Sequence, residues 1–165
     1  MTTHLEKCLA IILEAIGGAG DESKVRRDPK QWSVVEIVEH LTRAYSGTAK
    51  GFERCLEKGA SLASDTSLKQ RVQQFALINL GYFPAGRQAP KHILPTGELD
   101  LGAVIDAVRR DLARLDDSAI RTRQVIGAGK VLDHPILGPL SVDQWLKFHV
   151  VHTAHHARQI RERRA

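Results

Sequence analysis

Four of the eight histidines in this sequence fall in one short segment near the C-terminus, WLKFHVVHTAHHARQI. An α-helix turns by about 100° per residue, so His149, His152 and His156 would lie within about 60° of arc on one face. His152 and His156 are spaced i and i+4, which places two imidazoles one turn apart and within reach of one metal ion. Helical HxxxH zinc sites use the same spacing. The segment therefore predicts two ligands of a metal site.

A further ligand must come from another element, because two histidines from one helix rarely complete a site. His40 lies in the segment SVVEIVEHL, on the helical stripe that also carries Ile37 and Leu41. A histidine buried on such a stripe needs a polar partner. We therefore predict a divalent-metal site formed by His40, His152 and His156. Three imidazoles suit zinc, nickel, iron or copper, and they leave at least one coordination position for water or substrate.

The spacing leaves the role of His149 open. It could be a ligand, a hydrogen-bonding partner behind a ligand, or a core histidine bonded to a carbonyl, and we expect the second of these. His155 lies about 60° further round the helix than His152, so we expect it outside the site. No part in the site is expected for the three histidines at helix ends or in loops, which are His4, His92 and His134.

Two more residues are candidates for the pocket around the metal. Trp145 precedes His152 by two turns on the same face and could form a wall, although packing at a bundle end is the simpler role. Glu36 precedes His40 by one turn and could serve as a general base. It also completes a capping box with Ser33, and we expect that structural role to dominate. Candidates for a substrate entrance, which nothing in the sequence ranks, are Tyr45, Tyr82 and Arg87.

The elements that must position these residues are all predicted to be helical. Apolar residues recur at helical spacing in five segments, with capping boxes at Ser33 and Ser141 and no strand pattern. The segments are residues 2–16, 33–58, 67–80, 101–117 and 141–165. Residues 81–100 contain three prolines and form a long irregular loop, of a length that often marks a functional segment. We predict one all-α domain over residues 1–165, most simply an antiparallel up-down four-helix bundle with an extra short helix.

Composition narrows the class of protein. The chain is 42% hydrophobic and 26% charged, as in ordinary globular proteins. No apolar stretch approaches the roughly 20 residues that span a bilayer, so we expect a cytoplasmic protein with no membrane partner. Cys8 and Cys55 lack CxxC spacing and are expected to be reduced, buried thiols. The net charge of +5 owes much to arginines in the last helix and lacks interleaved aromatics, so nucleic-acid binding is not expected.

Two segments carry a resemblance to a known family. QWSVVEIVEHL (residues 31–41) and HPILGPLSVDQWLKFHVVHTAHHARQI (residues 134–160) resemble the W-S-x-x-E-x-x-x-H-L and H-x-x-H-H-x-x-Q motifs of the DinB superfamily, the DinB/YfiT-like proteins. The resemblance implies a four-helix bundle of DinB/YfiT type that holds a metal, most often zinc or nickel, through His40, His152 and His156. It also implies a homodimer and, for some members, a low-molecular-weight thiol such as bacillithiol, mycothiol or glutathione.

These observations favour a metal-dependent enzyme acting on a small-molecule substrate, such as a thiol S-transferase. A metal could stabilise a bound thiolate or activate water for hydrolysis. The alternative is a non-catalytic metal-binding or stress-related interaction protein on the same bundle.

Overall fold

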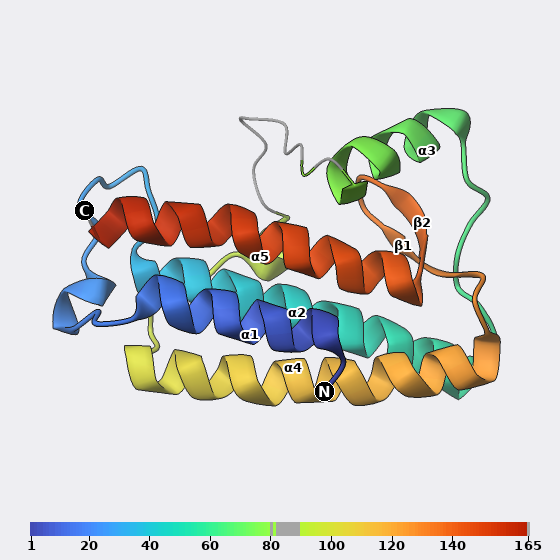
Figure 1. The fold of residues 1–165 in the computed structure, drawn as a ribbon, viewed down its shortest axis with the longest axis horizontal. Helices are drawn as coiled ribbons and strands as arrows, with labels where there is room; N and C mark the ends of the chain where they lie inside the picture. Colours follow the sequence, from blue (N-terminus) through green and yellow to red (C-terminus); the bar gives the residue numbers. More distant parts are fainter. Residues whose placement is uncertain (80, 82–89, 165) are drawn as a thin grey trace.

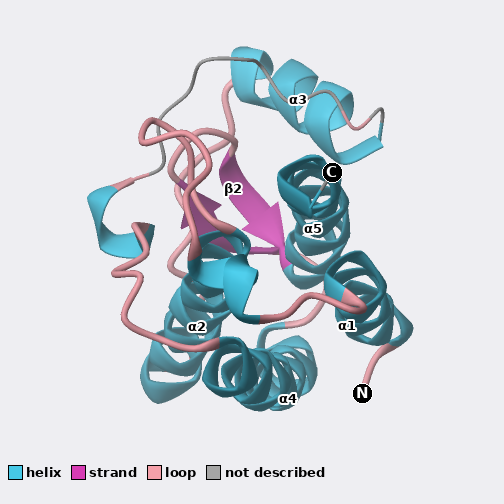
Figure 2. Ribbon diagram, turned by 90° about the vertical axis from the view of Figure 1, so that its left-hand side faces the viewer, coloured by secondary structure: helices cyan, strands magenta, loops and turns pink. Residues whose placement is uncertain are grey.

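Four long helices lie side by side in the computed structural model, which describes residues 1–79, 81 and 90–164 (Figure 1). They are α1 (Thr3–Ile16), α2 (Val34–Lys58), α4 (Leu101–Ile126) and α5 (Val142–Arg164). Viewed nearly along their axes, the four helices occupy the corners of a square (Figure 2). The prediction of a mainly helical chain is confirmed.

The order of helix directions differs from the simple up-down prediction. α2 and α4 run the same way along the bundle, and α1 and α5 run together in the opposite direction (Figure 1). Accordingly Glu39, early in α2, bonds Thr96 just before α4, whereas Phe52, late in α2, bonds Thr122 late in α4. The long segment between α2 and α4 makes this possible, because it returns the chain along the whole bundle before α4 begins.

Local sequence signals fix the ends of the helices. Ser33 accepts a hydrogen bond from the Glu36 amide while the Glu36 carboxylate accepts one from the Ser33 amide, which confirms the capping box predicted for α2. Gln144 and Ser141 make the same reciprocal pair at the start of α5. α2 ends at Gly59, whose φ of 62° is the left-handed conformation that glycine adopts without a steric cost.

A two-stranded antiparallel hairpin corrects the all-α prediction. Strands β1 (Lys130–His134) and β2 (Gly138–Ser141) join α4 to α5. No strand is predicted from the sequence in the segment DHPILGPL, which contains two prolines. In the structure Pro135 occupies the turn, and Pro139 lies in β2, an edge strand in which a missing N–H is tolerated. Gly51 on α2 lets the hairpin approach closely, because a β-carbon there would collide with the Leu132 side chain.

The remaining elements are short. α3 (Leu68–Gln74) continues into a π-helical turn, η2 (Phe75–Asn79), and covers the hairpin, where the Gln74 amide donates to two hairpin carbonyls. Two 3-10 turns, η1 (Asp21–Lys24) and η3 (Lys91–Ile93), lie in the connections. α4 extends nine residues beyond the predicted end at Asp117, since the small buried residues Ser118, Ala119 and Thr122 continue its inward face without the large apolar side chains that sequence periodicity detects.

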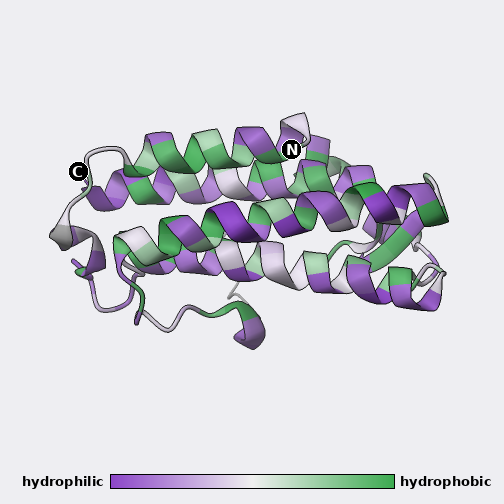
Figure 3. Cartoon of the chain, turned by 90° about the horizontal axis from the view of Figure 1, so that it is seen from below, coloured by the Kyte–Doolittle hydropathy of each residue, from purple (hydrophilic) through white to green (hydrophobic). Residues whose placement is uncertain are grey.

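Hydrophobic and hydrophilic residues alternate along each long helix (Figure 3), and the buried apolar ones form the core. The core includes buried side chains from all four long helices and from the hairpin. α2 packs mainly on α4, and α1 mainly on α5, so the two helix pairs meet less extensively along α2 and α5. Within the part of the chain that the structure describes, no helix is both long and apolar enough to cross a membrane.

Candidate metal centre

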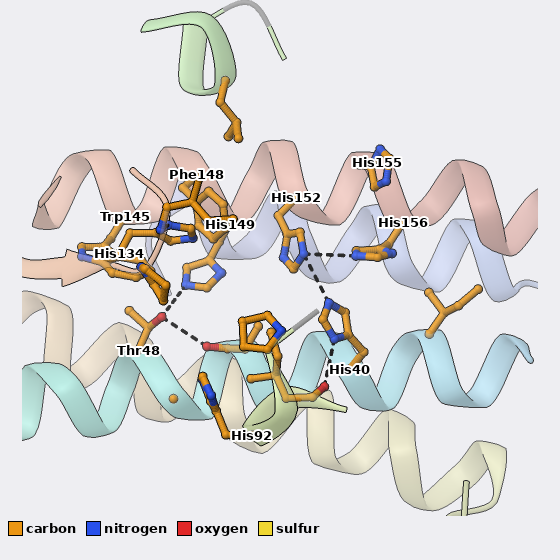
Figure 4. A pocket seen from close by; sticks show the side chains of 18 of the residues that line it. His40, Thr48, His92, His134, Trp145, Phe148, His149, His152, His155 and His156 are labelled. Carbon is orange, nitrogen blue, oxygen red and sulfur yellow. Dashed lines mark hydrogen bonds between the residues drawn. The ribbon is translucent and has the colours of Figure 1, made fainter. Parts of the chain in front are cut away.

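Three histidines from two helices converge between α2 and α5. His40 comes from α2, and His152 and His156 come from successive turns of α5 (Figure 4). All three side chains are at least nine-tenths buried, and one ring nitrogen from each lies within 4.8 Å of the other two. The Nε2 atom of His152 is 3.4 Å from Nε2 of His40 and 3.1 Å from Nε2 of His156. We call these three residues the histidine cluster.

The other ring nitrogens show which tautomer each histidine adopts. Nδ1 of His40 lies 2.9 Å from the Ile93 carbonyl oxygen, which can only accept, so Nδ1 carries the proton and donates it. Nδ1 of His156 likewise donates to Oε1 of Gln159 at 2.7 Å. In a neutral imidazole the second nitrogen then bears a lone pair. The Nε2 atoms of His40 and His156 therefore both direct lone pairs at His152.

This arrangement fits a cation better than it fits hydrogen bonds. Nε2 of His152 can carry one proton, so at most one of its two short contacts is a hydrogen bond, and neither partner nitrogen has a proton to give. A tetrahedral ion with nitrogen ligands at about 2.0–2.1 Å would separate those nitrogens by about 3.3–3.4 Å. Two of the three separations, 3.4 and 3.1 Å, are close to this value, and all three nitrogens lie within 4.8 Å of one another. Outer acceptors behind two of the imidazoles are also typical of metal-bound histidines.

Burial keeps the cluster neutral. It lowers the pKa of His40, and it lowers the pKa of His156 to about 3 with a further contribution from the nearby His40. The pKa of His152 falls well below its usual value, first through burial and then through the adjacent His156 and His40. All three imidazoles are therefore neutral near pH 7, which is the form that binds metal.

A buried carboxylate positions the carbonyl behind His40. Glu39 accepts hydrogen bonds from the Thr96 amide and hydroxyl and from the Gly97 amide, each at 2.9 Å. Its side chain also pairs with Arg43 on the next turn. These bonds hold the segment after η3 against α2, and Ile93 at the end of η3 then meets His40. Glu39 therefore acts on the cluster through the backbone and not by contact with it.

The cluster lies in the wall of a pocket of about 820 Å³. Phe148 stacks on the His152 ring at 5.2 Å, and Trp32 lies 4.9 Å from the His40 ring. Trp145 also lines the pocket, and its indole N–H donates to the Leu132 carbonyl of β1 at 3.1 Å. Trp145 thus both forms a wall, as its spacing suggested, and ties α5 to the hairpin.

His149 does not belong to the cluster. Its Nε2 lies 3.0 Å from the Thr48 hydroxyl, and its ring is stacked on Trp145 at 5.9 Å. It lines the pocket beside the cluster, and no hydrogen bond links it to a cluster residue among those described. His155 reaches the edge of the pocket and contacts the ring of His156 without contributing to the cluster.

Glu36 lies outside the pocket lining. Both carboxylate oxygens are bound by Arg26, and one also accepts the Ser33 amide, so the predicted structural role is the one the geometry supports. The guanidinium of Arg26 is the main cause that holds the pKa of this carboxyl below its usual range. Tyr45 is fully buried in the core and bonds Thr153, away from any entrance. Tyr82 and Arg87 lie outside the described residues.

Sequence reasoning missed several residues of this site. Glu39 was hidden by its position on a buried face next to the histidine, and the Ile93 carbonyl has no sequence signal at all. Gln159 stands at i+3 from His156, a spacing that could have suggested a hydrogen bond. His134 was assigned no role, yet it lines the pocket from the end of β1, a strand that was not predicted. His92 also lines the pocket, and His4 does not appear in its lining.

Fold and site together define a helical protein with a small hairpin and a buried three-histidine cluster in the wall of a pocket. The chain belongs to the family described as "Protein of unknown function (DUF1569)", which matches residues 18–163. It is also similar to "Uncharacterized protein YuaE" of Bacillus subtilis (strain 168). The two are 26% identical over an alignment of 159 residues, which covers 88% of this chain and 85% of the relative. No solved structure matches the chain significantly.

The family match corrects the resemblance drawn from the two histidine motifs. That match spans nearly the whole chain, whereas the motifs cover less than a quarter of it, and nothing in the comparisons indicates membership of the DinB superfamily. The resemblance was wrong because short histidine-containing motifs on helices recur wherever imidazoles are presented at the same spacing.

Proposed function

We propose that this protein binds one divalent transition-metal ion through His40, His152 and His156 and acts as a metal-dependent enzyme on a small molecule held in the adjoining pocket. The observation that carries the proposal is the convergence of three buried Nε2 atoms, two of them fixed as lone-pair donors by acceptors behind the rings. Three neutral imidazoles without a carboxylate ligand favour zinc or nickel over magnesium, calcium or manganese.

The chemistry at this site would come from the open coordination positions. An ion held by three imidazoles supplies Lewis acidity, which lowers the pKa of a bound water or thiol and makes it nucleophilic at neutral pH. The protein's own residues orient the ligands: Ile93 and Gln159 hold two rings, and Phe148 packs on the third. The aromatic walls would exclude water from one side of a bound substrate.

The carboxylates near the site decide between water and thiol chemistry. Asp133 is the one carboxylate that lines the pocket in the described ranges 1–79, 81 and 90–164, and it is exposed and accepts the Ser64 amide. Glu36 and Glu39 are both engaged elsewhere. Hydrolysis generally benefits from a positioned carboxylate base, whereas a thiol bound to metal can lose its proton to solvent. We therefore favour a metal-bound thiol, or another ligand that loses its proton to solvent, over an activated water.

Metal analysis tests the first half of the proposal. Purified protein is stripped, reloaded with zinc or nickel, desalted and analysed by mass spectrometry for metal, beside the double variant His152→Ala/His156→Ala. We expect about one ion per chain in the parent and essentially none in the variant. A parent that retains no stoichiometric metal after supplementation would sink the proposal. Light scattering on the loaded sample tests the homodimer, which stays a prediction.

Turnover tests the second half. Metal-loaded protein is incubated with bacillithiol, mycothiol or glutathione and the electrophile monochlorobimane, and bimane fluorescence is followed. Catalysis that disappears in His40→Ala but persists in His155→Ala would support an enzyme. The one carboxylate among the described pocket residues, Asp133, is exposed and already accepts the Ser64 amide, which leaves a second candidate, a non-catalytic metal-binding protein. No turnover with any of the three thiols, from protein that holds metal, would favour that role.

A further inference from the structure

Arg163 lies on the pocket side of α5, one turn beyond Gln159 and two turns beyond His156. Its side chain is 20% exposed, and its Nε is buried without a hydrogen-bond acceptor among the described residues. The nearest acid, Glu162, lies 3.7 Å from the guanidinium, which is too far for a hydrogen bond, and is 65% exposed. A buried N–H donor without an acceptor is unfavourable, so an oxygen atom of a ligand that accepted a hydrogen bond from Arg163 Nε would be stabilised here.

Four of the five charged side chains that line the pocket in the described part of the chain are cations. Its charged lining residues within the described ranges are Lys30, Lys50, Arg54, Arg163 and, as the single acid, Asp133. The Asp133 carboxylate is exposed and already accepts the Ser64 amide. A concave site surrounded by one sign of charge concentrates ligands of the opposite sign.

Much of the remaining pocket lining is apolar. Trp32, Trp145 and Phe148 contribute aromatic surface, and Ile93 and Leu77 contribute aliphatic surface. Pockets of this kind bind the apolar body of a small molecule by burial and fix its orientation through a few polar groups. The charged groups in this lining are mostly cationic.

We propose that the pocket takes an anionic small molecule with an apolar body, such as an aryl or alkyl carboxylate, whose anionic group binds the guanidinium of Arg163. The planar guanidinium offers paired N–H donors that match a carboxylate. This inference names the substrate class for the proposed function, but the anion-binding arrangement contains no metal. It can therefore be tested on protein from which metal has been removed.

Tryptophan fluorescence provides the measurement, because both tryptophans of the chain line the pocket. Metal-free protein is titrated with 4-phenylbutyrate and with the uncharged 4-phenylbutanamide, at low and at high salt. We expect the carboxylate to bind about tenfold more tightly at low salt, with a preference that shrinks as salt screens the charges. Equal affinity for acid and amide would overturn the proposal.

Variants locate the anion. Arg163→Gln should weaken carboxylate binding at least about fivefold while leaving the amide unchanged. Arg109→Gln removes an exposed charge on α4 outside the pocket lining and serves as the matched control. If Arg163→Gln does not fold, Arg163→Lys replaces it as the test. This variant keeps the charge but lacks the planar guanidinium, and it should give an intermediate loss of carboxylate binding. A loss that follows Lys50→Gln/Arg54→Gln and not Arg163→Gln would overturn the assignment to Arg163.

The two proposals fail separately. Stoichiometric metal in a parent that does not distinguish acid from amide would leave the metal site standing and remove the anionic substrate class. If the parent takes up no metal but prefers the carboxylate through Arg163, the metal site would be removed and the anionic substrate class would stand. Inorganic phosphate as a competitor reports whether the site accepts any oxyanion, and competition by phosphate at concentrations similar to those of 4-phenylbutyrate would overturn the requirement for an apolar body.

Discussion

Two groups of histidines line one pocket, and they differ in what their ring nitrogens contact (Figure 4). In the histidine cluster the Nε2 atoms face one another. In the second group, His134 and His149, the identified contacts are to other parts of the protein. Nδ1 of His134 accepts the Ile136 and Leu137 amides and caps the hairpin turn, while Nε2 of His149 meets the Thr48 hydroxyl.

Burial alone does not separate the two groups. Burial lowers the pKa of His134 to about 4 and that of His149 to about 3, much as it does for His156. A lowered pKa therefore shows only that an imidazole is neutral. The difference is where the ring nitrogens point. Those of the cluster converge on one point, where they can hold a metal ion, whereas His134 accepts backbone amides and His149 meets the Thr48 hydroxyl.

The largest expected difference between the groups is in metal affinity. His40→Ala should weaken zinc binding at least about 1000-fold, more than the 10–100-fold typical of losing an outer partner, because it removes a ligand. His134→Asn keeps an oxygen that can accept the turn amides and should bind zinc as the parent does. Competition with a chromophoric chelator measures both affinities. Similar losses in the two variants would erase the distinction between the groups.

Folding stability tests the structural role of the second group. His149 is fully buried, so His149→Ala creates a cavity and removes the bond to Thr48, at an expected cost of about 2–4 kcal/mol in the free energy of unfolding. His155→Ala, at the partly exposed edge of the pocket, should change it by less than about 0.5 kcal/mol. Urea denaturation in the presence of a chelator measures both, and an unchanged midpoint for His149→Ala would contradict a structural role.

Acid should destabilise the metal-free protein through both groups. The pKa values of His134 and His149 lie near 4 and 3 when folded and near 6.5 when unfolded, so between these limits the unfolded chain binds more protons. Stability should therefore be flat above about pH 6.5 and fall below it, by up to about 1.4 kcal/mol per pH unit for each histidine. Urea midpoints at pH 7, 6 and 5 test this. His149→Leu should reduce the slope, and a midpoint that rises as the pH falls would contradict the assignment.

The smallest expected effect concerns the acceptor behind the cluster. Gln159→Leu removes the oxygen that accepts the His156 Nδ1 proton and should weaken zinc binding about tenfold. Gln124→Leu, at an exposed position on α4, is the matched control and should leave the affinity unchanged. The chelator competition used for His40 applies here as well. Equal affinities for the two variants would show that Gln159 does not orient the ring.

Much of the helical framework could be predicted because its signals are local. The capping boxes at Ser33 and Ser141 and the glycine at 59 depend on residues only a few positions apart, and each lies at a helix end in the structure. The hairpin could not be predicted in this way. Its strands are short, and one proline lies in the turn and another in β2. Its position depends on the contact between Leu132 and Gly51 and on the Trp145 hydrogen bond, which join distant segments.

The sequence by itself determined that His152 and His156 share a helix face and that His40 lies on an inward stripe, because helical periodicity alone sets both. Only the tertiary structure decided that these three nitrogens meet, that His149 turns to Thr48, and that Ile93 and Gln159 fix two tautomers. The physical reason is that periodicity assigns a face but not the neighbour that face meets. That neighbour depends on helix direction and on a long connection held in place by Glu39.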